Sequence, residues 1–475
     1  MKLLSKQISI FFFIIVSLLA RPGQSLTSKN AKFIRKTLIS DTLQSIRVNG
    51  HGTGARLPDS YELEQIIASS RQIKFDNLQS DSLPKKIDHS QTKWFPPIGD
   101  QGAEGSCVAW ATGYYVKTFQ EAREHDWDLS NVNWINSGNG YPTIEAQNKI
   151  ISPDFIYHLT NNGQDQGITV FRAINFIQKY GASSWETMPN DPDNSTSWPA
   201  RKAWREAPQY RGASSPLFLI DTSAAQNRLF KQVLASGKLA LIHINAHRFS
   251  QLSDKDLWTV DNYQTTVFNH LNAVVGYDDD FGPFIENGDT TYGAFKVANN
   301  WGKGGWENQA DGFYYISYQC LQKYIKVAIL FEDRDKYQPT ILANFQLTHP
   351  YRGEIKMHMG IDRDDQNLIS KPFLEYNNSE DANFFPDNIL TLDISNFNDI
   401  INSNLDSVYL DLYDRGNYSE TAVLDSFYIE FFENGNLIRK YQYLSEDSLL
   451  TTSNNEHSRA SLIIHEDPML SISHD

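Results

Sequence analysis

Cysteine is scarce in this chain. Only Cys107 and Cys320 occur among its 475 residues. Small exported domains with little core are held together by several disulfides, and two cysteines cannot form such a framework. A small disulfide-stapled fold is therefore excluded, and a chain of this length is expected to depend on buried hydrophobic cores.

Positive charge is also in the minority. Lys and Arg number 42 against 57 Asp and Glu, which gives a formal net charge of −15. Proteins that bind nucleic acid display basic patches, and no stretch of domain size is basic here. We therefore expect no nucleic-acid partner. The chemistry inferred below requires no metal and no cofactor, so we expect neither.

Long apolar runs are confined to the N-terminus. Residues 8–20 form an apolar run of 13, which follows two lysines and precedes small residues at Gly23 and Ser25. Such a run is short for a membrane span and typical of a secretory signal. We predict a signal peptide at residues 1–25 and a secreted or periplasmic protein with no membrane span in the mature chain. An uncleaved anchor is the alternative.

Composition divides the rest of the chain into three parts. Residues 26–83 are polar, and we interpret them as a removable prosegment or a permanent N-terminal extension; Asp59 and Glu62 have the spacing of a helix capping box. Residues 84–334 mix helical and strand patterns, whereas residues 335–475 are strand-like. The predicted fold class is α+β, followed by a C-terminal β domain.

The C-terminal part carries clear strand signals. The stretch "SVYLDLYD" alternates with period two, and Asn434-Gly435 lies between apolar-aromatic runs. This pattern predicts a hairpin with a two-residue turn. Carboxylates of Asp362, Asp364 and Asp365 are of the type that calcium binds. A solvated acidic turn is nevertheless the preferred interpretation.

The surroundings of Cys107 suggest a reactive thiol. In "GDQGAEGSCVAWATGYYV", Ser106 is a good N-cap residue, and Ala111, Tyr115 and Phe119 follow at helical spacing. A cysteine in the first turn of a helix lies near unsatisfied N–H groups, which stabilise the thiolate and lower the thiol pKa. The alternative for any single cysteine is a buried residue that only packs.

Two later stretches change the balance between these readings. His270 in "NHLNAVVGYDD" directly precedes a strand-like run, and Asn299 in "VANNWGKGGWEN" lies two residues before Trp301. Together with "DQGAEGSCVAWA", and in this order, these motifs resemble the papain family of cysteine peptidases. The resemblance covers about residues 83–333, with weaker support from "SPDFIYHL" and "QGITVFRAINFIQKYG".

The resemblance implies a role for each motif residue. Cys107 would be the nucleophile, and His270 would be the general base and then the acid that protonates the leaving amine. Asn299 would orient the imidazole, and Trp301 would shield that contact from water. Gln101 would donate its side-chain amide to the developing oxyanion, beside the backbone N–H of Cys107.

The resemblance also implies an architecture. The papain fold has a helical lobe and a small antiparallel barrel lobe, with the site between them. Gly167 would offer its backbone to an extended peptide, and the neighbouring subsite would lie near Phe268 and Asn269. The C-terminal part resembles the P domain of proprotein convertases, which is a jelly-roll β-sandwich. An unrelated β-sandwich is the alternative there.

The function that follows is an exported, papain-like cysteine endopeptidase that acts on peptide or protein substrates. Two alternatives keep the same fold. One is a binding or adhesive protein with little turnover, and the other is a transpeptidase that passes its thioester to an amine. The C-terminal domain would then stabilise the enzyme or attach it to a surface or partner protein.

Overall fold

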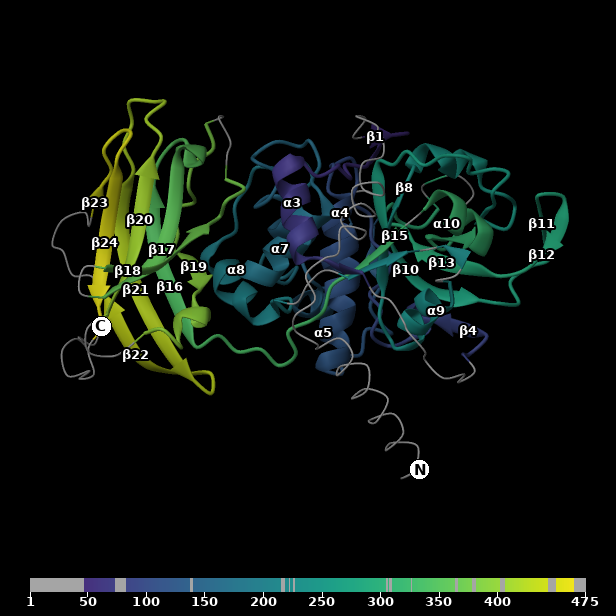
Figure 1. Cartoon of the computed structure of the whole chain (residues 1–475), viewed down its shortest axis with the longest axis horizontal. Helices are drawn as coiled ribbons and strands as arrows, with labels where there is room; N and C mark the ends of the chain where they lie inside the picture. Colours follow the sequence, from purple (N-terminus) through teal and green to yellow (C-terminus); the bar gives the residue numbers. More distant parts are fainter. Residues whose placement is uncertain are drawn as a thin grey trace, which may run out of the picture.

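The computed structural model describes residues 47–72, 83–136, 140–214, 218–221, 223–224, 227–304, 306, 310–325, 327–363, 366–377, 382–401, 406–442 and 450–464. Figure 1 shows three layers along the longest axis: the C-terminal sheets, a helical lobe in the middle and a sheet lobe beyond it. The predicted signal peptide lies outside the described residues. Within them, no helix is long and apolar enough to cross a membrane.

One long helix forms the centre of the helical lobe. It begins at Cys107 as α4 (Cys107–Ala109), continues as a π-helix, η2 (Trp110–Lys117), and ends as α5 (Thr118–Glu124). Its side chains are almost entirely buried, as their apolar spacing predicted, but the wide π turns were not predicted. The other helices of this lobe are α6 (Pro153–Tyr157), α7 (Val170–Tyr180) and α8 (Arg201–Glu206).

The sheet lobe is built on one mostly antiparallel sheet. In spatial order its strands are β3 (Arg71–Gln72), β7 (Phe218–Asp221), β15 (Val327–Leu330), β8 (Ala240–Ile244), β10 (His270–Asp278), β13 (Ala294–Ala298), β14 (Phe313–Ser317) and β9 (Leu257–Trp258), and β4 (Lys86–Asp88) also pairs with β10. Helices α9 (Asn227–Ala235) and α10 (Tyr318–Tyr324) belong to the same lobe. The expected barrel is not closed among the described strands, because the two-residue strands at either end, β3 and β9, do not pair with each other.

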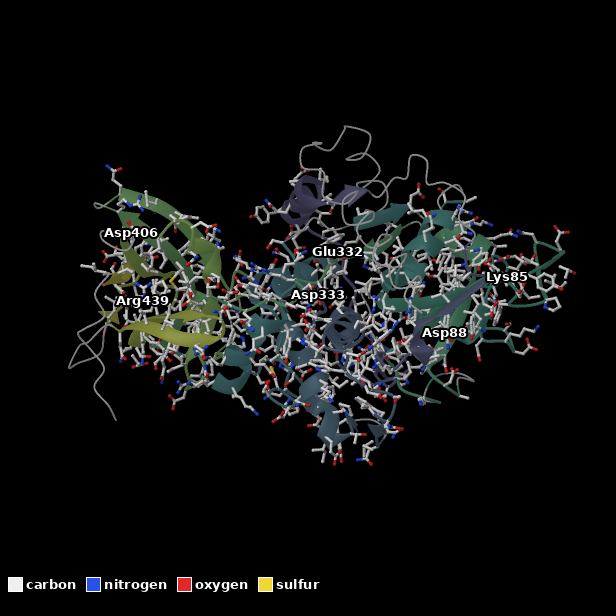
Figure 2. The ribbon with its side chains drawn as sticks, turned by 90° about the horizontal axis from the view of Figure 1, so that it is seen from below. Lys85, Asp88, Glu332, Asp333, Asp406 and Arg439 are labelled. Carbon is white, nitrogen blue, oxygen red and sulfur yellow. The ribbon has the colours of Figure 1, made fainter. Side chains whose placement is uncertain are left out.

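A buried cation connects these two lobes. Lys117, in the central helix, forms ion pairs with Glu121 one turn further along and with Asp333, just beyond β15. Figure 2 places Asp333 near the middle of the molecule. A buried ammonium needs carboxylate partners to offset its lost hydration, so this contact fixes the central helix against the returning chain of the sheet lobe.

Two antiparallel sheets make up the C-terminal part. One contains β19 (Leu390–Asp393), β16 (Ile341–Thr348), β21 (Val423–Glu433) and β22 (Asn436–Gln442), with β23 (Leu450–Thr451); the other contains β18 (Gln366–Phe373), β17 (Ile355–Arg363), β20 (Asp406–Asp414) and β24 (His457–Ile463). Buried residues of both sheets belong to one hydrophobic cluster. The hairpin at Asn434-Gly435 is confirmed, with both turn residues at positive φ.

The C-terminal sheets rest on the helical lobe. A buried ion pair joins Arg211 to Asp393 at 2.6 Å. From α7, Lys179 pairs with Glu375 at 2.6 Å, and Tyr180 donates a hydrogen bond to the same carboxylate at 2.9 Å. These contacts place the C-terminal sheets on the side of the helical lobe away from the sheet lobe (Figure 1). The likeness to a P domain stays a prediction.

The described part of the N-terminal stretch, residues 47–72, contacts both lobes. It contains β1 (Arg47–Val48), β2 (His51–Gly52), α3 (Ser60–Ser69) and β3. The capping box at the start of α3 is confirmed, with Asp59 and Glu62 bonding reciprocally. Glu62 also pairs with Arg172 of α7 at 2.9 Å, whereas β3 pairs in parallel with β7 of the sheet lobe.

Candidate active site

Cys107 begins the central helix, as predicted, and is fully buried. Ser106 precedes the helix, but its side chain makes no capping hydrogen bond. The Cys107 carbonyl accepts a hydrogen bond from Asn300 Nδ2 at 3.1 Å, a contact that joins the helix start to the sheet lobe. The thiol also lies close to the backbone N–H groups of Leu271 and Ala55.

His270 and Asn299 lie on adjacent strands of the sheet lobe. His270 is the first residue of β10, and Asn299 directly follows β13, which is antiparallel to β10 with Ala273 opposite Ala298. This register brings the two side chains together, with His270 Nε2 2.9 Å from Asn299 Oδ1. The other ring nitrogen, Nδ1, has no hydrogen-bond partner among the described residues. It is therefore the nitrogen available to a thiol.

A network of amides fixes this pair. Asn272 donates through Nδ2 to Asn299 Oδ1 at 3.0 Å and to Asn300 Oδ1 at 3.2 Å, and it accepts a bond from the Tyr314 hydroxyl. Asn272, Asn300 and Tyr314 were not predicted as site residues. A signal existed for one of them, because residues two apart on a strand share a face, so Asn272 must lie beside His270.

Aromatic rings cover the His270–Asn299 hydrogen bond. Trp301 is buried, and its ring centroid lies 4.8 Å from that of His270. Phe249 packs edge-on against both rings, at 6.2 Å from His270 and 5.1 Å from Trp301. Trp301 was predicted to cover this hydrogen bond, whereas the contribution of Phe249 was not predicted. The two rings exclude water that would otherwise compete for the imidazole contact.

Gln101 lies on the loop that leads to Cys107. Its backbone N–H donates to the carbonyl of Asn300 at 2.9 Å, and its side-chain Nε2 donates to the carbonyl of Glu104 at 2.7 Å. The residue is fully buried. The amide is therefore held on the loop that leads into the helix at Cys107.

Burial determines the charge states at this site. Burial lowers the pKa of His270 to about 4, against the opposing effect of its bond to Asn299. Burial also raises the pKa of the Cys107 thiol to about 12, although backbone N–H groups at Leu271 and Ala55 oppose this rise. The prediction of an ionised thiol is thus wrong for this arrangement, because desolvation outweighs the helix terminus.

What covers the thiol is a short stretch of the N-terminal part, residues 51–56, which we call the covering segment. On the helical lobe, Gly52 N donates to Gly102 O at 2.8 Å, Ile168 N donates to Gly54 O at 3.0 Å, and Arg56 N donates to Ile168 O at 3.0 Å. The pairing of this segment with the chain at Ile168 is parallel.

The covering segment is held on the sheet lobe as well. The backbone N–H groups of Gly54 and Ala55 both donate to Asn269 O at 3.0 Å. Trp301 Nε1 donates to Gly52 O at 2.8 Å, and the His51 ring stacks on Trp301 at 4.8 Å. The segment therefore bridges the two lobes directly above the Cys107 helix start.

Glycine is required at two positions of the covering segment. A Cβ at Gly52 would lie 1.7 Å from Glu104 O, and a Cβ at Gly54 would lie 2.1 Å from Gly105 O. Gly54 also has a φ of 119°, which disfavours other residues. By contrast, a Cβ at Gly50 would meet nothing within 4 Å. Only a glycine-containing backbone fits this close to the loop before Cys107.

The predicted substrate residues lie along the same segment. Gly167 N donates to the Tyr157 hydroxyl at 3.1 Å, and a Cβ at Gly167 would lie 2.1 Å from Gly54 O. The strand-like pairing itself is made by its neighbour Ile168. Asn269 contributes the carbonyl that accepts from the segment, and Phe268 is buried beside it.

The possible calcium stretch is described only in part. Asp362 forms an ion pair with Arg459 at 2.8 Å. Asp364 and Asp365 lie outside the described residues.

No protein-family model and no curated protein matches the chain. Among solved structures it is similar to xylellain, a cysteine protease from Xylella fastidiosa, with 16% identity and a TM-score of 0.39 over 61% of this chain and 98% of that one. It is also similar to the digestive procathepsin L2 proteinase of Tenebrio molitor larval midgut (14% identity, TM-score 0.39, 68% and 99% of the two chains). A structure from a study of the mite allergens Blo t 1 and Der p 1 matches with 14% identity and a TM-score of 0.38 over 56% and 75%. The assignment of a function therefore depends on the arrangement of the residues themselves.

Proposed function

We propose that this protein is a papain-like cysteine peptidase in which residues 51–56 block the site. The observation that carries the proposal is the His270–Asn299 pair, hydrogen-bonded at 2.9 Å beneath Trp301. Leu271, the next residue to His270 on β10, directs its backbone N–H toward the thiol of Cys107. A nucleophile, a base and a residue that orients the base are the minimum set for acyl transfer through a thioester.

Each residue has a defined part in the reaction. With the site open, His270 Nδ1 accepts the thiol proton, and the Cys107 thiolate attacks the peptide carbonyl carbon. Gln101 Nε2 and the Cys107 backbone N–H donate to the oxygen that becomes negative. The C–N bond then breaks and His270 returns its proton to the leaving amine. Water attacks the remaining thioester, gives up a proton through His270, and restores the thiol.

Asn299 acts through His270. By accepting from Nε2–H, it keeps that nitrogen protonated and leaves the lone pair of Nδ1 for the thiol. Removal of a group that only orients the base costs less activity than removal of the base itself.

The covering segment supports an inhibitory role for the N-terminal stretch. It makes backbone hydrogen bonds to Gly102 and Ile168 on one lobe and to Asn269 on the other, along the face that an extended peptide would use. Ala55 of this segment lies beside the thiol, whose pKa is raised by burial. We propose that residues 26–83 are a prosegment, cut near Leu83, and that residues 1–25 direct export.

Labelling with a cysteine-directed epoxide tests the enzyme proposal. Cys107 should be labelled in a Gly54→Val variant, in which the covering segment is displaced, and labelling should disappear in Gly54→Val/Cys107→Ala. Cys320, which is also buried, serves as the internal reference. Labelling of Cys107 at the same rate as Cys320 would contradict the proposal.

Self-processing provides a second test. Incubation of the full chain should produce a cut near Leu83, and the Cys107→Ala chain should remain intact under the same conditions. A cut that appears equally in both chains would assign it to a contaminating protease and remove the support for a prosegment.

The same burial favours a second candidate function, a papain-fold binding protein without turnover. A fully buried thiol with a pKa of about 12 is inert as it stands. If Gly54→Val binds peptides but neither labels nor cleaves them, this candidate replaces the first. In either case, we propose that the C-terminal sheets form an accessory β-sandwich that attaches the protein to a surface or partner.

A further inference from the structure

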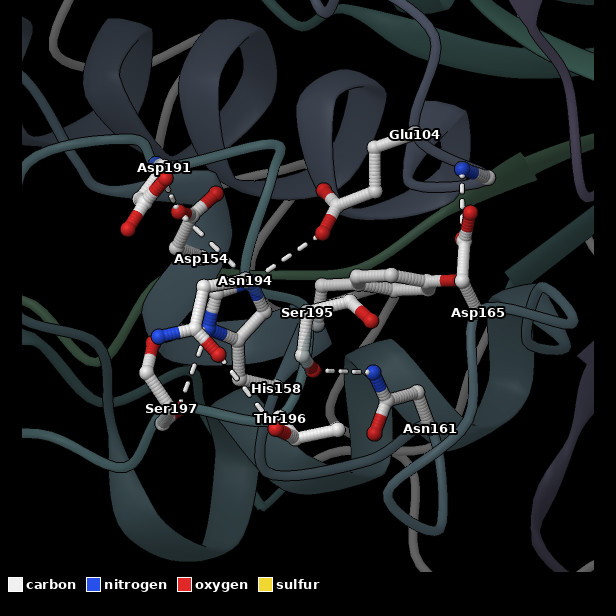
Figure 3. Close-up of polar contacts among 12 residues, drawn as sticks. Glu104, Asp154, His158, Asn161, Asp165, Asp191, Asn194, Ser195, Thr196 and Ser197 are labelled. Carbon is white, nitrogen blue, oxygen red and sulfur yellow. Dashed lines mark hydrogen bonds and ion pairs between the residues drawn. The ribbon is translucent and has the colours of Figure 1, made fainter.

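A second group of ionisable side chains is buried within the helical lobe. Glu104 lies on the loop before Cys107, while Asp154 and His158 belong to α6 and its C-cap. Each of the three is at most 1% exposed. Figure 3 shows the carboxylates of Glu104, on the loop before Cys107, and of Asp154, on α6, both turned toward the imidazole. The proposed peptidase chemistry does not use any of the three.

The imidazole of His158 is oriented as a metal ligand would be. Nδ1 lies 3.1 Å from the Ser197 carbonyl and 2.9 Å from its hydroxyl, which places a proton on Nδ1. Nε2 then faces Glu104 Oε1 at 3.1 Å and Asp154 Oδ2 at 3.6 Å. Histidines that bind metals commonly donate their other N–H to a backbone carbonyl in this way.

Each of the two carboxyl groups has one oxygen that no neighbouring group among those the structure describes satisfies. Glu104 Oε2 and Asp154 Oδ1 are buried and have no hydrogen-bond partner within the described part of the chain. Asp154 Oδ2 accepts a hydrogen bond from the Asp191 backbone N–H at 2.5 Å, and the nearby Ser106 side chain partly offsets the burial that raises the pKa of Glu104. Within the described residues, His158 is the only ion-pair partner of either acid, and Asp165 and Asp191 add further negative charge nearby. Unpaired buried carboxylate oxygens are costly and are usually satisfied by a proton or a cation.

The spacing of the three donors suits a metal ion. One ligand atom from each residue lies within 4.8 Å of the others. Zinc bonds of about 2.0–2.2 Å in tetrahedral geometry put neighbouring donors roughly 3.3–3.6 Å apart, close to the two distances measured from Nε2. One imidazole with two carboxylates is a donor set that favours zinc or manganese over calcium.

We propose that Glu104, Asp154 and His158 form a binding site for a divalent transition-metal ion, with Zn²⁺ as its best occupant. The ion joins the loop before Cys107 to α6. Because the Glu104 carbonyl accepts the hydrogen bond from Gln101 Nε2 at 2.7 Å, the ion also steadies the side chain proposed as the oxyanion donor. The metal site itself does not depend on the peptidase assignment.

The test uses the full chain with Cys107→Ala, so that the thiol of the candidate active site cannot bind metal. After treatment with a chelator, titration with Zn²⁺ followed by calorimetry and elemental analysis should give one equivalent bound and a raised Tm. Glu104→Gln and His158→Gln, made in the same background, should each weaken Zn²⁺ binding at least tenfold.

A matched control separates this site from the Glu121/Glu124/His125 group, which also places three donors together but is partly exposed. His125→Gln should leave the tightly bound equivalent of Zn²⁺ unchanged. Co²⁺ bound to the parent protein should show the absorption of nitrogen and oxygen ligands, a readout that holds even if a variant fails to fold. The proposal would be overturned if His125→Gln abolished Zn²⁺ binding, or if Ca²⁺ bound more tightly than Zn²⁺. It would also be overturned if no Zn²⁺ were bound at a Zn²⁺ concentration of about 1 mM.

Discussion

Two of the buried histidines, His270 and His158, occupy contrasting surroundings. His270 lies among carboxamides, and burial lowers its pKa to about 4, so it is a neutral base. His158 lies between two carboxylates, and burial raises the pKa of Glu104 to about 8 and that of Asp154 to about 7. Burial disfavours whichever form is charged. Neutral neighbours therefore create a base, and acidic neighbours create a place for a cation.

The largest expected effect on labelling of Cys107 comes from removal of the His270 imidazole. In the Gly54→Val background, His270→Ala should slow epoxide labelling of Cys107 at least about hundredfold, since general-base assistance contributes 10²–10⁴. The rate is measured by mass spectrometry of the labelled peptide. His247→Ala is the matched control, because His247 is exposed and outside the site. Equal rates in the two variants would remove His270 from the mechanism.

Acid stability should report the neutral state of the same imidazole. The pKa of His270 is about 4 in the folded chain and about 6.5 when unfolded, so its contribution is present above pH 6.5 and is lost as pH falls through 4. Between those limits the Cys107→Ala chain should lose roughly 3 kcal/mol more stability than Cys107→Ala/His270→Gln. Urea unfolding at several pH values measures this, and parallel curves would contradict a buried neutral imidazole.

Displacement of the covering segment should change the reactivity of the thiol. Gly54→Val puts a side chain against Gly105 O, which removes the segment and rehydrates Cys107. Labelling at pH 7 should rise about tenfold or more, and the alkaline midpoint of labelling should move down from about 12. Tyr61→Val is the control, since that side chain lies on α3, outside the covering segment, and is 73% exposed. A similar rise in both variants would exclude a specific block.

The smallest effect is expected at the amide network. Asn272→Ala removes the bonds that Asn272 donates to Asn299 and Asn300. The imidazole keeps its own partner, so labelling in the Gly54→Val background should fall only by a factor of about three to ten. The labelling rate should also fall in Asn272→Asp, because a carboxylate cannot donate a hydrogen bond to Asn299 Oδ1. Labelling faster than the parent would show that the network restrains the base.

Much of the site's arrangement was predictable from the sequence. The helix that starts at Cys107 followed from its apolar spacing, and the sheet brings His270 and Asn299 together as the motif order implied. The hairpin at Asn434-Gly435 followed from local turn chemistry. These features depend on short-range patterns, which single sequences carry.

Other features depend on long-range contacts and left little local signal. The local sequence does not mark Gly52 and Gly54 as packed residues, although their lack of a Cβ is needed where they lie against Glu104 and Gly105. Cys107 is buried by parts of the chain that are distant in sequence, among them Ala55 and Leu271, so the charge of its thiol was predicted wrongly. Glu104 and His158 likewise become neighbours only after folding, and neither has an unusual sequence context.

The covering segment is part of the same chain as the site that it covers, and it is anchored at β3 on one lobe and at α3 on the other. While the chain is intact, the local concentration of this blocking peptide is set by its tether and is unaffected by dilution. After a cut, the same contacts become those of a dissociating ligand. Activity should then appear sooner in dilute solution than in concentrated solution. At high protein concentration, the cut protein should therefore stay inhibited.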